Sequence, residues 1–150
     1  WNEFINYSKN HVKLTGVEAK YAAPLTTNAK IAILHGAAQY CLQDKNGQIA
    51  DTHSISAGLD YPGVSPLHCM LKDTKRAKYT SCSDEGALNA LKLIWKYENL
   101  RPSLEPAHAW AECIRIAPKL KKDEVIIVNN CGSGSKDAKI IKNKIGYYPK

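Results

Sequence analysis

The chain has 150 residues, of which 44% are hydrophobic and 23% charged, which suits one globular domain over residues 1–150 and excludes an intrinsically disordered chain. Its net charge of +7 is spread along the sequence without interleaved aromatic residues or a nucleic-acid-binding motif, so a lysine-rich solvated surface is favoured over a nucleic-acid binder. The apolar runs are too short for a helix that crosses a membrane.

The cysteines and the N-terminus indicate the compartment. Five cysteines occur without a C-x-x-C pair, and the histidines lack metal-ligand spacing, which argues against a disulfide framework and a zinc site. No basic-then-apolar signal pattern opens the chain. We therefore expect a reducing, cytoplasmic location. Because the sequence begins with Trp1 rather than methionine, we also expect a processed chain or a piece of a longer one.

The first half of the sequence predicts extended segments joined by loops. The stretch 2–8 fits the end of a helix, 12–18 predicts a strand, and 29–36 fits either a strand or a helix. Asn46-Gly47 is a strong hairpin-turn signal. The stretch 53–66 is a long loop with glycine and proline breakers, and its apolar residues argue for a functional rather than a disordered loop.

The second half alternates strands and helices. A strand is predicted at 77–82, and a helix capped by Ser83 or Asp84 is predicted to run to about Glu98. A second helix carries Pro106 in its first turn, with a buried stripe of Ala107, Trp110, Ala111 and Ile114.

The apolar run in the C-terminal third, residues 125–128, is the segment on which the predicted fold class depends. The wholly apolar run 125–128 predicts a buried strand of a parallel sheet, followed by a last helix at about 136–144. The order strand, helix, helix, strand, helix predicts an α/β fold with an open, mostly parallel sheet flanked by helices.

The stretch NNCGSGSKD (129–137) follows that predicted strand, where open α/β sheets bind ligands. It lacks the residues of a P-loop and of a G-x-G-x-x-G motif. Cys131 could be a nucleophile if His53, His68 or His108 lay nearby, but an inert thiol is the favoured interpretation.

Two carboxylates also stand out. Glu105 lies at or beside a helix N-cap, where the helix dipole stabilises its carboxylate by roughly 0.3–1 kcal/mol. This stabilisation is a complete structural explanation for a glutamate at this position. A functional role would place it in one cleft with Cys131. Asp60, just before Pro62-Gly63, fits an Asx turn or a charged latch on a mobile loop.

Several motifs, in order along almost the whole chain, resemble the tryptophan synthase beta chain. The most specific is SISAGLDYPGV (54–64), within the longer match 46–88. The others are RPSLEPAHAWA (101–111), VNNCGSGSKD (128–137), GVEA (16–19), APL (23–25) and ILHGAAQYCLQD (33–44).

The resemblance implies a fold-type-II pyridoxal-phosphate lyase that joins L-serine to indole, giving L-tryptophan and water by β-replacement, with the cofactor as electron sink. It implies that Glu105, Cys131, Gly132 and Gly58 contact the cofactor. Asp60 matches the closing loop, and Leu34 and His35 match tunnel-lining positions. The backbone carbonyls of Tyr61 and Gly63 match a monovalent-cation site.

The chain also departs from the family pattern. The Schiff-base lysine and the cofactor-phosphate loop fall in an N-terminal part that this sequence does not contain, so no catalytic lysine is expected on this chain. Cys131 replaces the usual serine; because a thiol is neutral but a weaker hydrogen-bonding group, we expect the reaction class to persist at a cost of ~1 kcal/mol. Only Lys20–Ala22 remain of a longer glycine-rich stretch, and Ser133 and Ser135 replace part of a basic and acidic pattern.

These features lead to two expectations. The first is the C-terminal part of a tryptophan synthase beta chain, inactive alone and dependent on the missing N-terminal part, with an alpha chain as a further partner. The second is a non-catalytic remnant that acts as a subunit-interaction module. Both predict apolar surface left uncovered, and hence self-association into an oligomer.

Overall fold

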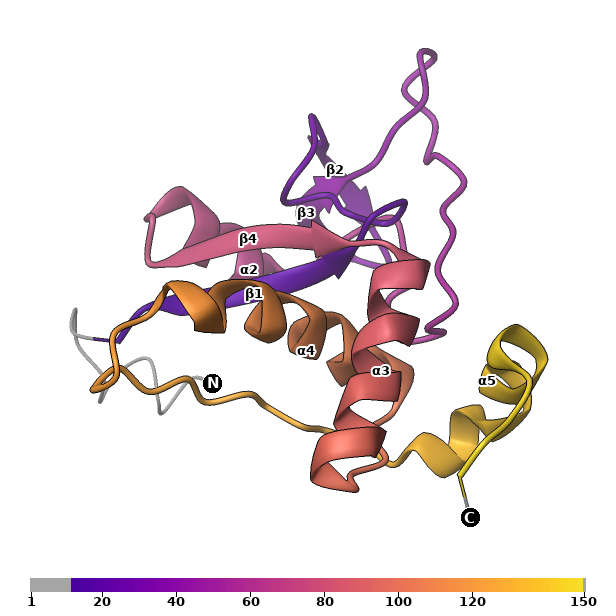
Figure 1. The fold of residues 1–150 in the computed structure, drawn as a ribbon. Helices are drawn as coiled ribbons and strands as arrows, with labels where there is room; N and C mark the ends of the chain where they lie inside the picture. The colour runs from indigo at the N-terminus through magenta and orange to yellow at the C-terminus, as the bar shows by residue number, and fades with distance from the viewer. Residues whose placement is uncertain (1–11, 150) are drawn as a thin grey trace.

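The computed structural model describes residues 12–149, so the predicted helix end at 2–8 lies outside the described residues. At its centre, β1 (Leu14–Ala19) and β4 (Ala77–Cys82) pair in parallel, with Leu14 opposite Ala77 (Figure 1). Helix α2 (Pro66–Asp73) supplies Leu71 to a small core with Leu14 and Ala77. The sequence prediction missed α2, although Ser65 caps it and Pro66 opens it.

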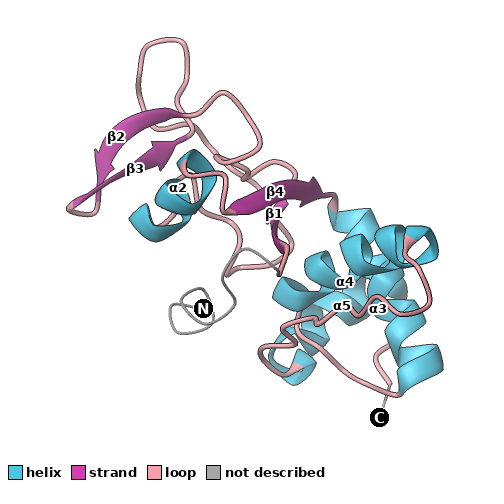
Figure 2. Ribbon diagram, turned by 90° about the vertical axis from the view of Figure 1, so that its left-hand side faces the viewer, coloured by secondary structure: helices cyan, strands magenta, loops and turns pink. Residues whose placement is uncertain are grey.

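A second, antiparallel pair projects from one end of the molecule (Figure 2). It consists of β2 (Lys30–Leu34) and β3 (Ala37–Cys41), joined by a turn in which His35 and Gly36 both have positive φ. The strand alternative for 29–36 is therefore correct. One face of β2 is open to solvent, with Ile31 71% and Ile33 72% exposed.

The main core lies between two helices at the other end of the molecule. Ser83, one of the two predicted capping residues, caps α3 (Asp84–Glu98) by accepting a hydrogen bond from Gly86 N. Helix α4 (Leu104–Ile116) packs against α3. The core cluster consists of Ile55, Ala87, Leu91, Trp95, Leu104, Ala107 and Ile141. Of the predicted buried stripe of α4, only Ala107 is fully buried; Trp110 and Ala111 are partly buried, and Ile114 is 36% exposed. The prediction failed because α4 buries its N-terminal end, Leu104, Pro106, Ala107 and His108, and not a stripe along its whole length.

The C-terminal segment contains a predicted element that is wrong. Residues 125–128 are extended but form no strand, and Val125 and Ile127 are 84% and 81% exposed. A buried parallel strand needs hydrogen-bonding neighbours and a covering layer on both faces. The described residues provide neither. The chain then enters the short helix η3 (Gly134–Asp137) and α5 (Ala138–Ile145), which together match the predicted last helix.

The fold class is mixed α/β, as predicted, but the single open sheet is not present in residues 12–149. The strands form two separate two-stranded sheets, one parallel and one antiparallel. The predicted strand at 77–82 is confirmed. The predicted loop at 53–66 is confirmed except at Pro66, which begins α2, and Gln43 and Ile49 bridge across the Asn46-Gly47 turn. No helix within the described residues has the length and apolar character needed to cross a membrane.

Candidate functional site

The N-terminus of α4 meets the turn after the exposed 125–128 segment. Asp137 Oδ2 accepts a hydrogen bond from Leu104 N at 2.8 Å, which satisfies a backbone donor that the N-cap residue Ser103 leaves open. The Ser103 hydroxyl instead donates to the carbonyl oxygen of Cys131 at 3.1 Å. These two bonds hold α4 and the turn together across about thirty residues of sequence.

Glu105 lies in the first turn of α4 and collects donors from two other segments. Gly58 N donates to its Oε1 at 3.1 Å, and Lys136 Nζ lies 3.0 Å and 2.9 Å from Oε1 and Oε2. Burial by itself raises the pKa of Glu105, but the hydrogen bonds from Lys136, the backbone and Ser103 outweigh it and lower the pKa to about 2. Glu105 is therefore a fixed negative charge at neutral pH.

Gly58 comes so close to Glu105 that no larger residue fits without movement. A Cβ atom at position 58 would lie 2.7 Å from Glu105 Oε1. Gly132 has a φ of +77°, and a Cβ there would lie 2.7 Å from Ser103 Oγ. Both glycines therefore permit close approach of the backbone to side chains of the α4 N-terminus.

The structure thus brings Glu105, Gly58 and the Cys131–Gly132 turn into one cluster, which we call the Glu105 cluster. Cys131 is exposed, and its thiol has no hydrogen bond to any residue in 12–149. The histidines considered as bases contact other groups: His53 contacts Asp84, His68 contacts Tyr79 and His108 contacts the Leu104 carbonyl. The geometry therefore gives no support to Cys131 as an activated nucleophile.

A cavity of about 330 Å³ lies beside this cluster, between β1, α2 and the loop 58–65. Its lining includes Gly58, Tyr61 and Gly63 together with Glu18, His68 and Tyr79. Burial raises the pKa of Glu18, lowers that of His68, and raises that of Tyr79 to about 12 with help from the nearby Glu18 charge. The positions predicted to bind a cation therefore lie in a cavity with a carboxylate on its wall.

The remaining predicted site residues lie in the loop 58–65 or in the β2–β3 hairpin beside it. His35 Nδ1 is 2.7 Å from the Tyr61 hydroxyl, so the tip of the β2–β3 hairpin contacts the loop. The neighbouring Leu34 carbonyl accepts from Gln39 Nε2. Asp60 accepts a hydrogen bond from the Thr52 hydroxyl at 2.8 Å and has no bond to the Glu105 cluster within the described residues.

Sequence reasoning missed Lys136, Asp137 and Glu18. Lys136 and Asp137 bind the α4 N-terminus, and Glu18 accepts hydrogen bonds from Leu25 N and Thr26 N. Lys136 and Asp137 end the stretch NNCGSGSKD, which matches neither a P-loop nor a G-x-G-x-x-G motif. A basic and an acidic residue directly after a glycine-rich turn were the signal that could have identified them.

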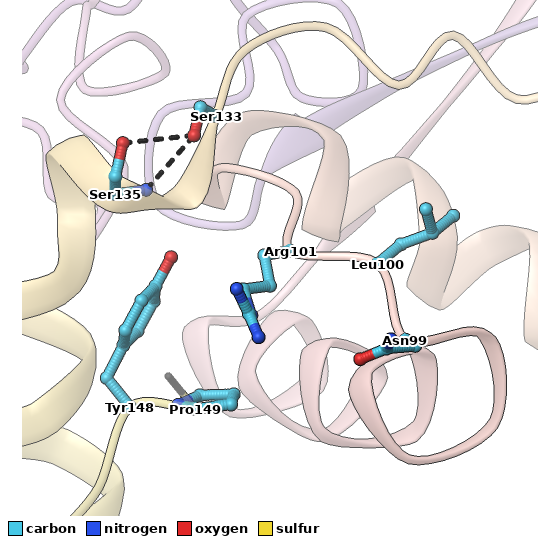
Figure 3. A pocket seen from close by; sticks show the side chains of 7 residues that line it. All are labelled: Asn99, Leu100, Arg101, Ser133, Ser135, Tyr148 and Pro149. Atoms are coloured by element: carbon cyan, nitrogen blue, oxygen red, sulfur yellow. Dashed lines mark hydrogen bonds between the residues drawn. The ribbon is translucent and has the colours of Figure 1, made fainter.

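A larger hollow of about 510 Å³ lies near the same turn, between the α3–α4 connection and the C-terminal segment (Figure 3). Asn99, Arg101, Ser133, Ser135 and Tyr148 supply its polar groups, and Ser133 Oγ lies 3.0 Å from Ser135 Oγ.

No protein-family model matches the chain. Over an aligned length of 143 residues, however, it is 46% identical to the tryptophan synthase beta chain of Chromobacterium violaceum. The chain is homologous to part of a tryptophan synthase beta chain. The alignment covers 90% of this chain but only 36% of that relative, so the chain spans about a third of the relative's length. The resemblance inferred from the sequence motifs is thus confirmed for a portion of such a chain.

Tryptophan synthase beta chains belong to a family that uses pyridoxal phosphate, so the cluster can be tested for its fit to that group. A thiol is a weak hydrogen-bond donor and acceptor, so the exposed Cys131 thiol suits a pyridine nitrogen, whereas Gly58 and Gly132 already pack closely against Glu105 and Ser103. The chemistry of the exposed Cys131 thiol is therefore compatible with a contact to the cofactor ring.

Proposed function

We propose that this chain provides the C-terminal part of a pyridoxal-phosphate-dependent tryptophan synthase beta chain, which converts L-serine and indole to L-tryptophan and water. One observation carries the proposal: the 46% identity spans motifs whose residues Gly58, Glu105 and Cys131 meet in a single cluster. The contacts among residues drawn from separate motifs support a single shared site.

In this proposal the Glu105 cluster holds the ring of the cofactor. Cys131 faces the pyridine nitrogen as a neutral group, and Glu105 supplies a fixed negative charge kept in place by Gly58 N–H and Lys136. When bound, pyridoxal phosphate serves as the electron sink for loss of the serine hydroxyl and addition of indole. The chain's own residues orient the ring and set the charge around it.

The loop and hairpin beside the cluster complete the proposed site. We assign the Tyr61 and Gly63 carbonyls to a monovalent cation, which the cavity they share with Glu18 supports. Asp60 acts in closure of the loop over the substrate. Leu34 and His35 line the path of indole, a placement supported by the contact between His35 and Tyr61.

Turnover requires a segment beyond these 150 residues. The chain spans 36% of its relative, and the Schiff-base lysine is assigned to the remaining part. The exposed Val125 and Ile127 support this, because a run without strand partners in residues 12–149 suits a place in a larger, mostly parallel sheet.

Complementation tests the proposal. The chain is mixed with pyridoxal phosphate, serine and indole, with and without the separately expressed N-terminal part of the Chromobacterium violaceum relative. We expect tryptophan only in the complete mixture, and at least about tenfold less with Glu105→Gln. Glu112→Gln, which changes a mostly buried glutamate of α4 paired with Arg115, is the matched control and should retain activity.

Two results would contradict the proposal. Turnover by the chain alone, or a borohydride-reducible cofactor adduct on one of its own lysines, would show that it is catalytically complete. Binding of the N-terminal part without turnover would instead support the alternative function, a subunit-interaction module. The exposed apolar residues of β2 and of 125–128 are the observation that favours this alternative.

A further inference from the structure

The hollow beside Arg101 has walls that are fixed by contacts between distant segments. Gly134 N donates to the Arg101 carbonyl at 2.9 Å, and Pro102 and Ser133 form an isolated β-bridge. On the other side, the Tyr148 ring packs edge-on against the buried Trp95, with 5.5 Å between ring centroids. The α3–α4 connection and the C-terminal segment are thus both anchored to the core, which makes the hollow a preformed feature.

The polar groups of the hollow suit an anion. Figure 3 shows the Arg101 side chain and the Tyr148 hydroxyl directed into it, with Ser133 and Ser135 on the adjoining wall. A guanidinium carries five N–H donors in a planar fork, so it can bind a ligand alongside its protein contacts. None of the described lining residues is acidic. A carboxylate entering the hollow therefore meets one positive charge and several hydroxyl groups.

Part of the lining is apolar and favours a ligand whose uncharged part is also apolar. Leu100, Pro149 and the ring of Tyr148 form this part of the wall. The volume of about 510 Å³ is in the range of small-molecule sites. Inorganic phosphate would leave this apolar wall uncovered, whereas an aromatic or aliphatic acid would cover it while its carboxylate paired with the guanidinium fork.

We propose that this hollow, which is lined by Asn99, Leu100, Arg101, Ser133, Ser135, Tyr148 and Pro149, is a binding site for a small carboxylate with an apolar body. It shares no lining residue with the cavity between β1 and α2, and none of Gly58, Glu105, Cys131 and Lys136 lines it. The site is therefore separate from the one proposed for the cofactor, and it would stand if that proposed function failed.

The test uses the full chain and three probes of known charge. Benzoate, its neutral isostere benzamide and inorganic phosphate are titrated into ¹⁵N-labelled protein at low ionic strength. We expect benzoate to shift the amide signals of Arg101, Ser133 and Ser135 saturably, with benzamide and phosphate at least about tenfold weaker. The benzoate shifts should weaken with added salt, because the site is open to solvent.

Two variants localise the binding. Arg101→Gln removes the charge and should weaken benzoate binding about tenfold or more, whereas Arg115→Gln, at an exposed arginine of α4, should leave it unchanged. Ser135→Leu fills the hollow without altering Arg101 and should also abolish binding. It keeps the test valid if Arg101→Gln disturbs the fold. Equal affinity for benzoate and benzamide, tighter binding of phosphate, or full benzoate binding by Ser135→Leu would each overturn the proposal.

Discussion

Lys136 Nζ lies 3.0 Å and 2.9 Å from the two carboxylate oxygens of Glu105, although 31 positions separate the residues. Lys136 also lies 3.2 Å from Asp137 Oδ1, while Asp137 Oδ2 accepts a hydrogen bond from the α4 N-terminus. One ammonium group therefore joins the carboxylates of Glu105 and Asp137, and it fixes both the position and the charge of Glu105.

Replacing Lys136 by methionine should raise the pKa of Glu105 from about 2 toward its ordinary value of 4.5, because burial then acts without the main opposing hydrogen bond. Carboxyl carbon NMR of the titrating protein measures this directly. Lys139→Met changes an exposed lysine of α5 and should leave the pKa of Glu105 where it is. An unchanged Glu105 titration in Lys136→Met would show that the ion pair does not form in solution.

The same variant changes how stability depends on pH. A carboxylate whose pKa is lowered in the folded state contributes stability that is present above its unfolded pKa of 4.5 and is lost as the pH falls toward 2. Because Lys136 is half-exposed, we expect Lys136→Met to lose only about 1 kcal/mol at pH 7. Urea unfolding should show this difference shrinking between pH 4.5 and 2, and a constant difference would contradict the assignment.

The sequence predicted local elements well where the signal was local. Ser83 sets the start of α3 by its own capping bond, and the Asn46-Gly47 turn needs only its neighbouring residues, so both were found. The 125–128 segment failed for the opposite reason. Its apolar residues predict a buried strand, but such a strand forms only beside other strands, and residues 12–149 do not supply them.

The sequence identified individual residues of the site but not the hydrogen bonds that connect them. Glu105 and Cys131 were named from motifs, and their proximity was only a condition of the functional interpretation. The contacts that join them, from Ser103, Lys136 and Asp137, connect positions about thirty residues apart and leave no periodic trace in the sequence. Helix α2 was missed because its eight residues are too few for a clear hydrophobic period.

Substituting Gly58 by alanine should disrupt the contact with Glu105, since the new Cβ would lie 2.7 Å from Oε1. Overpacking of this kind costs about 1–3 kcal/mol, measured as the free energy of unfolding in urea. Glu105→Ala removes the atoms in the way, so Gly58→Ala should cost less than about 0.5 kcal/mol in that background. Equal costs in both backgrounds would show that the two residues do not meet.

Tyr79 should make the protein sensitive to alkali. Burial and the nearby Glu18 raise the pKa of Tyr79 to about 12. A group that binds its proton more tightly when folded contributes stability that is present below its ordinary pKa of 10 and is lost as the pH rises toward 12. One proton limits the loss to ~1.4 kcal/mol per pH unit, and the loss should be smaller than this because the ring is only half-buried.

Phenylalanine at position 79 removes this ionisation, so the stability of Tyr79→Phe relative to wild type should improve between pH 10 and 12 in urea-unfolding measurements. At pH 7 the variant should be weaker by about 1 kcal/mol, because it lacks the hydrogen bond to His68. Tyr97→Phe, at a tyrosine that is 68% exposed, controls for general alkaline effects and should follow wild type. Parallel behaviour of the two variants would contradict the burial of Tyr79.

Mutations in the exposed run 125–128 should affect self-association of this chain but not its folding stability. Replacing Val125 and Ile127 together by threonine should change the free energy of unfolding by less than about 0.5 kcal/mol, because both side chains are more than 80% exposed. Ile141→Ala, at a fully buried residue of the same C-terminal region, should cost about 2–5 kcal/mol. Light scattering should show less self-association in the threonine variant, because the apolar surface available to a second copy is reduced. A stability loss comparable to that of Ile141→Ala would mean that this run is buried in solution, and the extended, uncovered conformation would then be wrong.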